Sequence, residues 1–194
     1  MKKRHFLTAA ALGGASLATL AQTASTRTSS PVLLTVTGAI GKVNRGPIDP
    51  VLDQMMAKQK ISFEKAHGFD FGELAALPAV TIKPTLEYDN KVHTLKGPLL
   101  IDVLRAAGAT PADSVKLLMR AVDGYSPSIT MADVRKYRFI VATHLDGKSM
   151  PLGGLGPLWA VYDADRFPDM AARKVNERFG LCPWALYHIE VPEA

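Results

Sequence analysis

The segment from Leu145 to Asp163, LDGKSMPLGGLGPLWAVYD, constrains the fold more than any other part of the chain. Asp146-Gly147 is a typical turn pair between two short strands. Three glycines follow, and a proline then leads into an apolar run that contains Trp159. The pattern predicts a strand, a turn, a short strand, a glycine-rich bend and a buried strand. A chain with this segment is built around β-sheet.

Further strands alternate with short helices along the rest of the chain. Apolar alternation and β-branched residues predict strands at 32–40, 79–88, 115–122, 138–145, 158–162 and 184–191. Helix signals predict helices at 49–60, at 71–77 after Asp70, at 98–107 with Pro98 in the first position, and at 131–136 after Thr130. Strands with helices inserted between them indicate an α+β protein with a mixed sheet.

The beginning of the chain predicts export. Lys2, Lys3 and Arg4 precede an apolar stretch, 6–20, that is too short to span a bilayer. This pattern is typical of a secretory signal peptide, which we place at residues 1–24. A polar linker at 25–31 follows, and a single domain at 32–194 completes the predicted organisation. The predicted location is the periplasm.

Charge and cysteine content exclude several classes of protein. The chain has 23 basic and 18 acidic residues, and three of the basic ones lie in residues 1–24. The remaining balance of 20 to 18 gives no reason to expect nucleic-acid binding. Cys182 is the single cysteine, so no intramolecular disulfide is predicted. The histidines lack the spacing of a zinc site.

Four segments in order resemble the molybdopterin-binding domain of the sulfite-oxidase family. They are KGPLLIDVL at 96–104, DGYSPSIT at 123–130, the glycine bend with GPLW at 153–159, and WALYHIEV at 184–191. The similarity extends from Phe69 to Val191. It implies an α+β fold with a mixed sheet or partial barrel, short inserted helices and a cleft shaped for a pterin.

The chain departs from that family at two chemical positions. The family's molybdenum-binding cysteine is expected near Val80–Lys83, where this chain has no cysteine. The family's substrate arginine position is occupied by Trp159. Molybdenum needs a thiolate, and an oxyanion substrate needs an arginine fork. The departures therefore predict that redox chemistry is lost while a pterin cleft is retained.

Six residues are candidates for contacting a pterin: Trp159, Tyr125, Asp123, Gly156, Glu87 and Tyr88. An aromatic ring stacks on a flat heterocycle, and a carboxylate accepts from its donor edge. Each candidate also has a structural alternative: a core side chain for Trp159, packing for Tyr125, a turn for Asp123 and Gly156, and a solvated strand end for Glu87 and Tyr88.

Small exported members of this fold are pterin-binding regulators of membrane enzymes that make or break cyclic di-GMP, and the chain resembles them. The resemblance implies a non-catalytic protein whose ligand is a pterin without molybdenum. The implied partner is the periplasmic domain of a membrane signalling protein. Two alternatives remain open, a molybdopterin-dependent oxidoreductase or its subunit, and an envelope interaction protein with a vestigial cleft.

Overall fold

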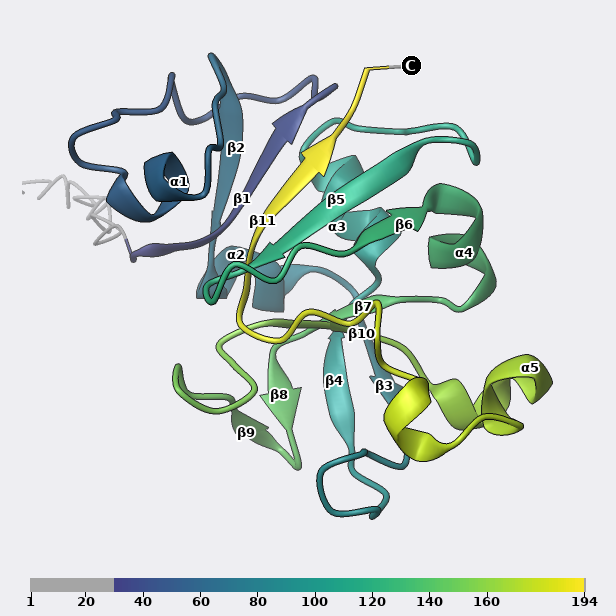
Figure 1. Cartoon of the computed structure of the whole chain (residues 1–194). Helices are drawn as coiled ribbons and strands as arrows, with labels where there is room; N and C mark the ends of the chain where they lie inside the picture. The colour runs from purple at the N-terminus through teal and green to yellow at the C-terminus, as the bar shows by residue number, and fades with distance from the viewer. Residues whose placement is uncertain (1–29, 194) are drawn as a thin grey trace, which may run out of the picture.

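The computed structural model describes residues 30–193 and is shown in Figure 1. The predicted signal peptide and most of the predicted linker lie outside the described residues. The described chain combines three sheets with short helices and is not a closed barrel, which confirms the predicted α+β class. Within this part of the chain, no helix is long and apolar enough to cross a bilayer.

The largest sheet has five strands in the order β2-β1-β11-β5-β6. Their bounds are β1 Val32–Gly38, β2 Ala66–Asp70, β5 Lys116–Ala121, β6 Ser128–Thr130 and β11 Leu186–Val191. The first and last strands, β1 and β11, pair in parallel, and the other neighbours are antiparallel. Leu34 and Val36 of β1 and Ile189 of β11 point to the main core, so this face of the sheet is apolar.

A second layer of strands lies below this sheet in Figure 1. It contains a four-stranded sheet, β3-β4-β8-β9, and a two-stranded sheet, β10-β7. Their bounds are β3 Ala79–Ile82, β4 Leu95–Pro98, β7 Ile140–Ala142, β8 His144–Leu145, β9 Lys148–Ser149 and β10 Trp159–Val161. Gly97 of β4 allows the two sheets to meet, because a Cβ there would lie 1.9 Å from the carbonyl oxygen of Val141. The predicted succession of strands, turn and bend between Leu145 and Asp163 is confirmed.

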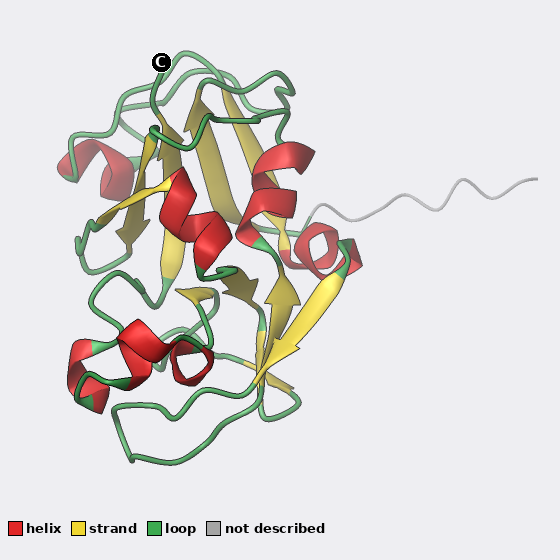
Figure 2. Ribbon diagram, turned by 90° about the vertical axis from the view of Figure 1, so that its right-hand side faces the viewer, coloured by secondary structure: helices red, strands yellow, loops and turns green. Residues whose placement is uncertain are grey.

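The helices are short, as Figure 2 shows. Their bounds are α1 Gln54–Lys58, α2 Phe71–Ala76, α3 Leu100–Ala106, α4 Met131–Lys136 and α5 Pro168–Ala171, with 3-10 turns at Ala164–Arg166 and Val175–Glu177. The two predicted caps are confirmed. Asp70 and Glu73 form a capping box at the start of α2, and the Thr130 hydroxyl accepts from the backbone N–H of Asp133 in α4. Both helices therefore begin where their local sequence indicates.

Two helix predictions were wrong in their extent. Pro98 belongs to β4 and not to a helix, because it pairs with Ala79 of β3, and α3 begins only at Leu100. The helix predicted at 49–60 shrinks to α1, because the Asp49 carboxylate accepts from the backbone N–H groups of Val51 and Leu52 and closes a turn.

The outer face of the five-stranded sheet is partly polar. His188 is fully buried, with Nε2 2.9 Å from the Thr37 hydroxyl and Nδ1 2.9 Å from Nη1 of Arg120. Since a guanidinium only donates, Nδ1 of His188 accepts and its Nε2–H donates to Thr37. Arg120 also donates to the Glu190 carboxylate at 2.8 Å.

A second apolar cluster shares this outer face. Met56, Ile61, Phe63, Ala66 and Tyr187 pack together in it. The Gln59 side chain adds hydrogen bonds from Nε2 to the carbonyl oxygens of Ala121 and Val122, and accepts from the Tyr187 hydroxyl. These contacts attach α1 and the loop after it to the sheet, and they place α1 beside the end of β5.

Candidate ligand-binding cleft

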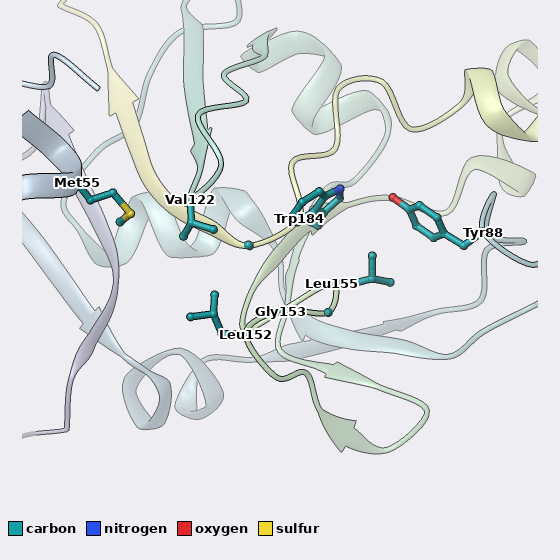
Figure 3. A pocket seen from close by; sticks show the side chains of 9 residues that line it. Met55, Tyr88, Val122, Leu152, Gly153, Leu155 and Trp184 are labelled. Carbon is teal, nitrogen blue, oxygen red and sulfur yellow. The ribbon is translucent and has the colours of Figure 1, made fainter. Parts of the chain in front are cut away.

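A cleft of about 770 Å³ opens where α1, the end of β5, the glycine bend and the entry to β11 meet (Figure 3). Its lining residues come from five segments of the chain. They are Met55, Tyr88, Val122, the bend residues Leu152, Gly153, Gly154 and Leu155, and the pair Trp184 and Ala185. None of these side chains is charged. The volume lies in the range of about 300–1,000 Å³ that encloses most small-molecule ligands.

Two aromatic side chains flank one end of the cleft. Trp184 is half-buried, whereas Tyr88 is 55% exposed. In Figure 3 the hydroxyl end of Tyr88 points toward Trp184, and Leu155 lies below the space between the two rings. Partial desolvation of its hydroxyl, assisted by the negative charge of Glu87, raises the pKa of Tyr88 to about 12. The phenol therefore keeps its proton at neutral pH and offers an uncharged aromatic face to a ligand.

Glu87 brings a carboxylate to the same end. Its side chain is half-buried and does not line the cleft, but its charge contributes to raising the pKa values of both Tyr88 and Cys182. The negative charge of Glu87 therefore acts on Tyr88, its neighbour in the sequence, and on Cys182, two residues before Trp184.

The glycine bend forms the lower wall. Gly153 adopts a φ of +95°, a conformation that L side chains rarely take. The carbonyl oxygen of Leu155 accepts from the backbone N–H of Ala185 at 3.2 Å, so the bend is attached to the entry of β11. Gly156 does not reach the cleft. A Cβ there would lie 2.4 Å from Met150, so Gly156 serves close packing and not ligand approach.

Trp159 is placed differently from the expected stacking position. Its side chain is 1% exposed, its Nε1–H donates to the carbonyl oxygen of Cys182 at 2.9 Å, and its ring lies 6.2 Å from that of Phe179. No face of this indole is open to a ligand, so the core alternative describes it. The tryptophan that lines the cleft is instead Trp184, the first residue of the last strand that the sequence predicts.

Tyr125 and Asp123 lie outside the cleft. The Asp123 carboxylate accepts from the backbone N–H of Tyr125 at 2.9 Å, which is the turn role considered for it. The Tyr125 hydroxyl donates to the carbonyl oxygen of Gly180, and its ring is about half exposed. Of the six candidates, Tyr88 lines the cleft and Glu87 adjoins it. The sequence signal for these two residues was their place at the end of the strand predicted at 79–88, whereas in the structure β3 ends at Ile82.

The residues present do not fit a molybdenum-bound cofactor. Cys182 is buried, and desolvation holds the pKa of its thiol well above the usual value, so it carries no thiolate to a metal. Among residues 30–193 no group of three His, Cys, Asp or Glu side chains is arranged to hold a metal ion. The chemistry that the lining of the cleft offers is stacking and apolar contact.

No protein-family model matches the chain, and no curated protein matches it. Among solved structures, it is similar to the sulfane dehydrogenase SoxCD from Paracoccus pantotrophus, with a TM-score of 0.52 and 14% sequence identity. The match covers 83% of this chain and 38% of that chain, so the protein spans well under half the length of the dehydrogenase chain. At this identity the likeness concerns the fold alone. The fold of this protein is thus related to that of the dehydrogenase, in agreement with the expected sulfite-oxidase-like architecture.

Proposed function

We propose that this protein is a non-catalytic binding protein for a flat, pterin-type heterocycle held between Trp184 and Tyr88. The observation that supports this proposal is that these two aromatic side chains lie at one end of a cleft with an uncharged lining, and that the negative charge of Glu87 acts on Tyr88. A pterin has a ring that stacks on aromatic faces and a donor edge, the exocyclic amine with the adjacent ring N–H, that pairs with a carboxylate.

The energies of these contacts are sufficient for useful affinity. Stacking of a heterocycle on an aromatic side chain contributes about 1–3 kcal/mol. A hydrogen bond to a charged group contributes roughly 1.5–3 kcal/mol. Stacking on Trp184 and one charge-assisted edge, together with burial of the ring, are consistent with a dissociation constant in the micromolar range.

A binding role is preferred over catalysis because the cleft lacks reactive groups. The lining side chains are aliphatic or aromatic, and its one phenol, Tyr88, has a pKa of about 12. A general acid or base works best with a pKa near the operating pH. The rival function, a molybdopterin-dependent oxidoreductase or its subunit, draws support from the fold of the sulfane dehydrogenase. It predicts about one molybdenum per chain after expression in a cofactor-competent host.

The proposal extends to signalling. Val51 and Leu52 are strongly exposed apolar residues on the turn before α1, and Met55 of α1 lines the cleft. A ligand that contacts Met55 alters the surroundings of this surface. The proposed reader of the surface is the periplasmic domain of a membrane enzyme that makes or breaks cyclic di-GMP. Such signalling requires that the ligand favour one of two states of the protein.

A fluorescence titration tests the binding function. The chain has two tryptophans, so Trp159→Phe leaves Trp184 as the sole indole reporter, and Trp184→Phe leaves Trp159. Titration with oxidised and reduced pterins is expected to quench Trp184 saturably in the first variant. The second variant is expected to show weaker binding by calorimetry. Absence of saturation with every pterin up to millimolar concentration would overturn the proposal.

A further inference from the structure

The two ends of the cleft differ in chemistry. The rings of Trp184 and Tyr88 mark one end, and Figure 3 shows Met55 at the opposite end. Val122 and Leu152 extend toward the space between them from above and below in this view. The second end therefore has only aliphatic and thioether side chains, and we call Met55, Val122 and Leu152 the aliphatic end.

The aromatic end alone accommodates the heterocycle. A cavity of about 770 Å³ is of the size that encloses drug-sized ligands, which are larger than a bare bicyclic ring. A ring stacked between Trp184 and Tyr88, with its donor edge toward Glu87, leaves the aliphatic end for another part of the same molecule. That part is the substituent on the side of the ring away from the donor edge.

We propose that the aliphatic end binds an uncharged, apolar substituent of the ligand, so that the protein selects pterins with an aryl or alkyl side arm over pterins with a phosphorylated one. This inference rests on the proposed function, because it takes the ring to occupy the aromatic end. The assignment follows from the lining, which offers a side arm apolar contact and no charged partner.

The aliphatic end is suited to gaining contact area. Leu152 is 69% exposed and Met55 is 42% exposed, so a side arm lying between them covers apolar surface that water now reaches. Met is flexible and adapts to irregular partners. Each buried methylene strengthens binding by about fourfold when fully desolvated.

A phosphate-bearing side arm is disfavoured at the aliphatic end. A charged group moved next to aliphatic side chains loses hydration without a hydrogen-bonding partner. The expected order of affinity is therefore aryl-bearing, then methyl-bearing, then phosphate-bearing pterin.

Three pterins of one oxidation state test the inference by calorimetry: 6-methylpterin, a pterin with a phenylalkyl group at position 6, and 6-hydroxymethylpterin phosphate. The phenylalkyl compound is expected to bind at least about tenfold more tightly than 6-methylpterin. Leu152→Asp is expected to remove that advantage, so that the phenylalkyl compound binds the variant no more tightly than 6-methylpterin does. Val43→Asp introduces the same charge at an exposed apolar residue outside the lining and is expected to change neither affinity.

The outcomes separate the inference from the proposed function. If 6-methylpterin binds but the phenylalkyl arm gives no advantage, or the phosphate arm binds more tightly, the inference is overturned and the binding function stands. If the advantage survives Leu152→Asp, the aliphatic end is not its source and the inference fails. If none of the three compounds binds, both proposals fail.

Discussion

Trp159 and Trp184 are bridge partners in antiparallel geometry, yet only one of the two indoles reaches the cleft. Trp159 is enclosed by the core and hydrogen-bonded to the carbonyl oxygen of Cys182, whereas Trp184 remains half-buried at the wall. Trp159 is therefore part of the core, and Trp184 is the indole that is open to the proposed ligand.

This division predicts opposite effects of the two alanine variants. Trp184→Ala is expected to weaken pterin binding by at least tenfold with a small loss of stability. Trp159→Ala is expected to lower the free energy of unfolding by about 3–5 kcal/mol, the usual cost of truncating a buried large aromatic side chain. Urea denaturation and calorimetric titration of both proteins measure the two effects. Equal loss of affinity in two folded variants would contradict the division.

Glu87→Gln is expected to weaken pterin binding by at least about tenfold, because a charge-assisted hydrogen bond to the donor edge becomes a neutral one. The same change removes a negative charge beside Tyr88 and is expected to lower the pKa of that phenol, which absorbance at alkaline pH records. Asp123→Asn is the matched control, since Asp123 serves a turn. A larger effect of Asp123→Asn than of Glu87→Gln would transfer the edge contact to Asp123.

The glycine bend offers a matched pair of substitutions. Gly156→Ala is expected to destabilise the protein by about 1–3 kcal/mol, because its new Cβ would lie 2.4 Å from Cβ and from the backbone oxygen of Met150. Gly154→Ala meets its nearest atom at 3.6 Å and is expected to have little effect. Thermal denaturation compares the two. Similar melting temperatures would show that the bend relaxes around the added methyl group.

His188 predicts a loss of stability in acid. Burial, together with the positive charges of Arg120 and Arg45, lowers the pKa of His188 to about 3. In the unfolded chain His188 takes up a proton near pH 6.5, whereas in the folded protein it stays neutral until the pH approaches 3. The contribution of His188 to the free energy of unfolding is therefore complete above pH 6.5 and is lost as the pH falls toward 3. The slope approaches roughly 1.4 kcal/mol per pH unit.

NMR of the imidazole ring tests the His188 prediction directly. The resonances are expected to remain those of the neutral ring, protonated at Nε2, between pH 8 and pH 4. Titration with a midpoint near 6.5 would contradict the buried arrangement with Thr37 and Arg120.

Local signals predicted local structure well in this chain. Asp70 and Thr130 cap their helices because a cap needs only its own side chain and the next three residues. The strand β4 was missed, because the strand conformation of a residue such as Pro98 depends on pairing with Ala79, nineteen positions earlier in the sequence. Which apolar side chains are buried was harder to predict than which residues form helices and strands. Both tryptophans lie in apolar segments, and the contacts of Trp159 with Phe179 and Cys182 decide which indole is enclosed.

The candidate cleft was predicted in part for the same reason. Tyr88 and Glu87 were candidates because they lie at the end of the strand predicted at 79–88, the segment in which the resemblance would place a molybdenum-binding cysteine. Met55 and Val122 gave no sequence signal, since they meet at the cleft only after α1 attaches to the end of β5 through Gln59. Contacts of this kind depend on the assembled sheet.

The cleft is lined by segments that stretch from Met55 to Ala185, so no single hairpin or helix contains it. It forms only when the ends of the domain have come together, and any ligand it holds binds the folded chain and not the unfolded one. Binding to the folded state alone raises the free energy of unfolding of the whole domain. The increase is about 2.7 kcal/mol at a ligand concentration one hundred times the dissociation constant. A bound ligand would therefore protect the whole domain against unfolding.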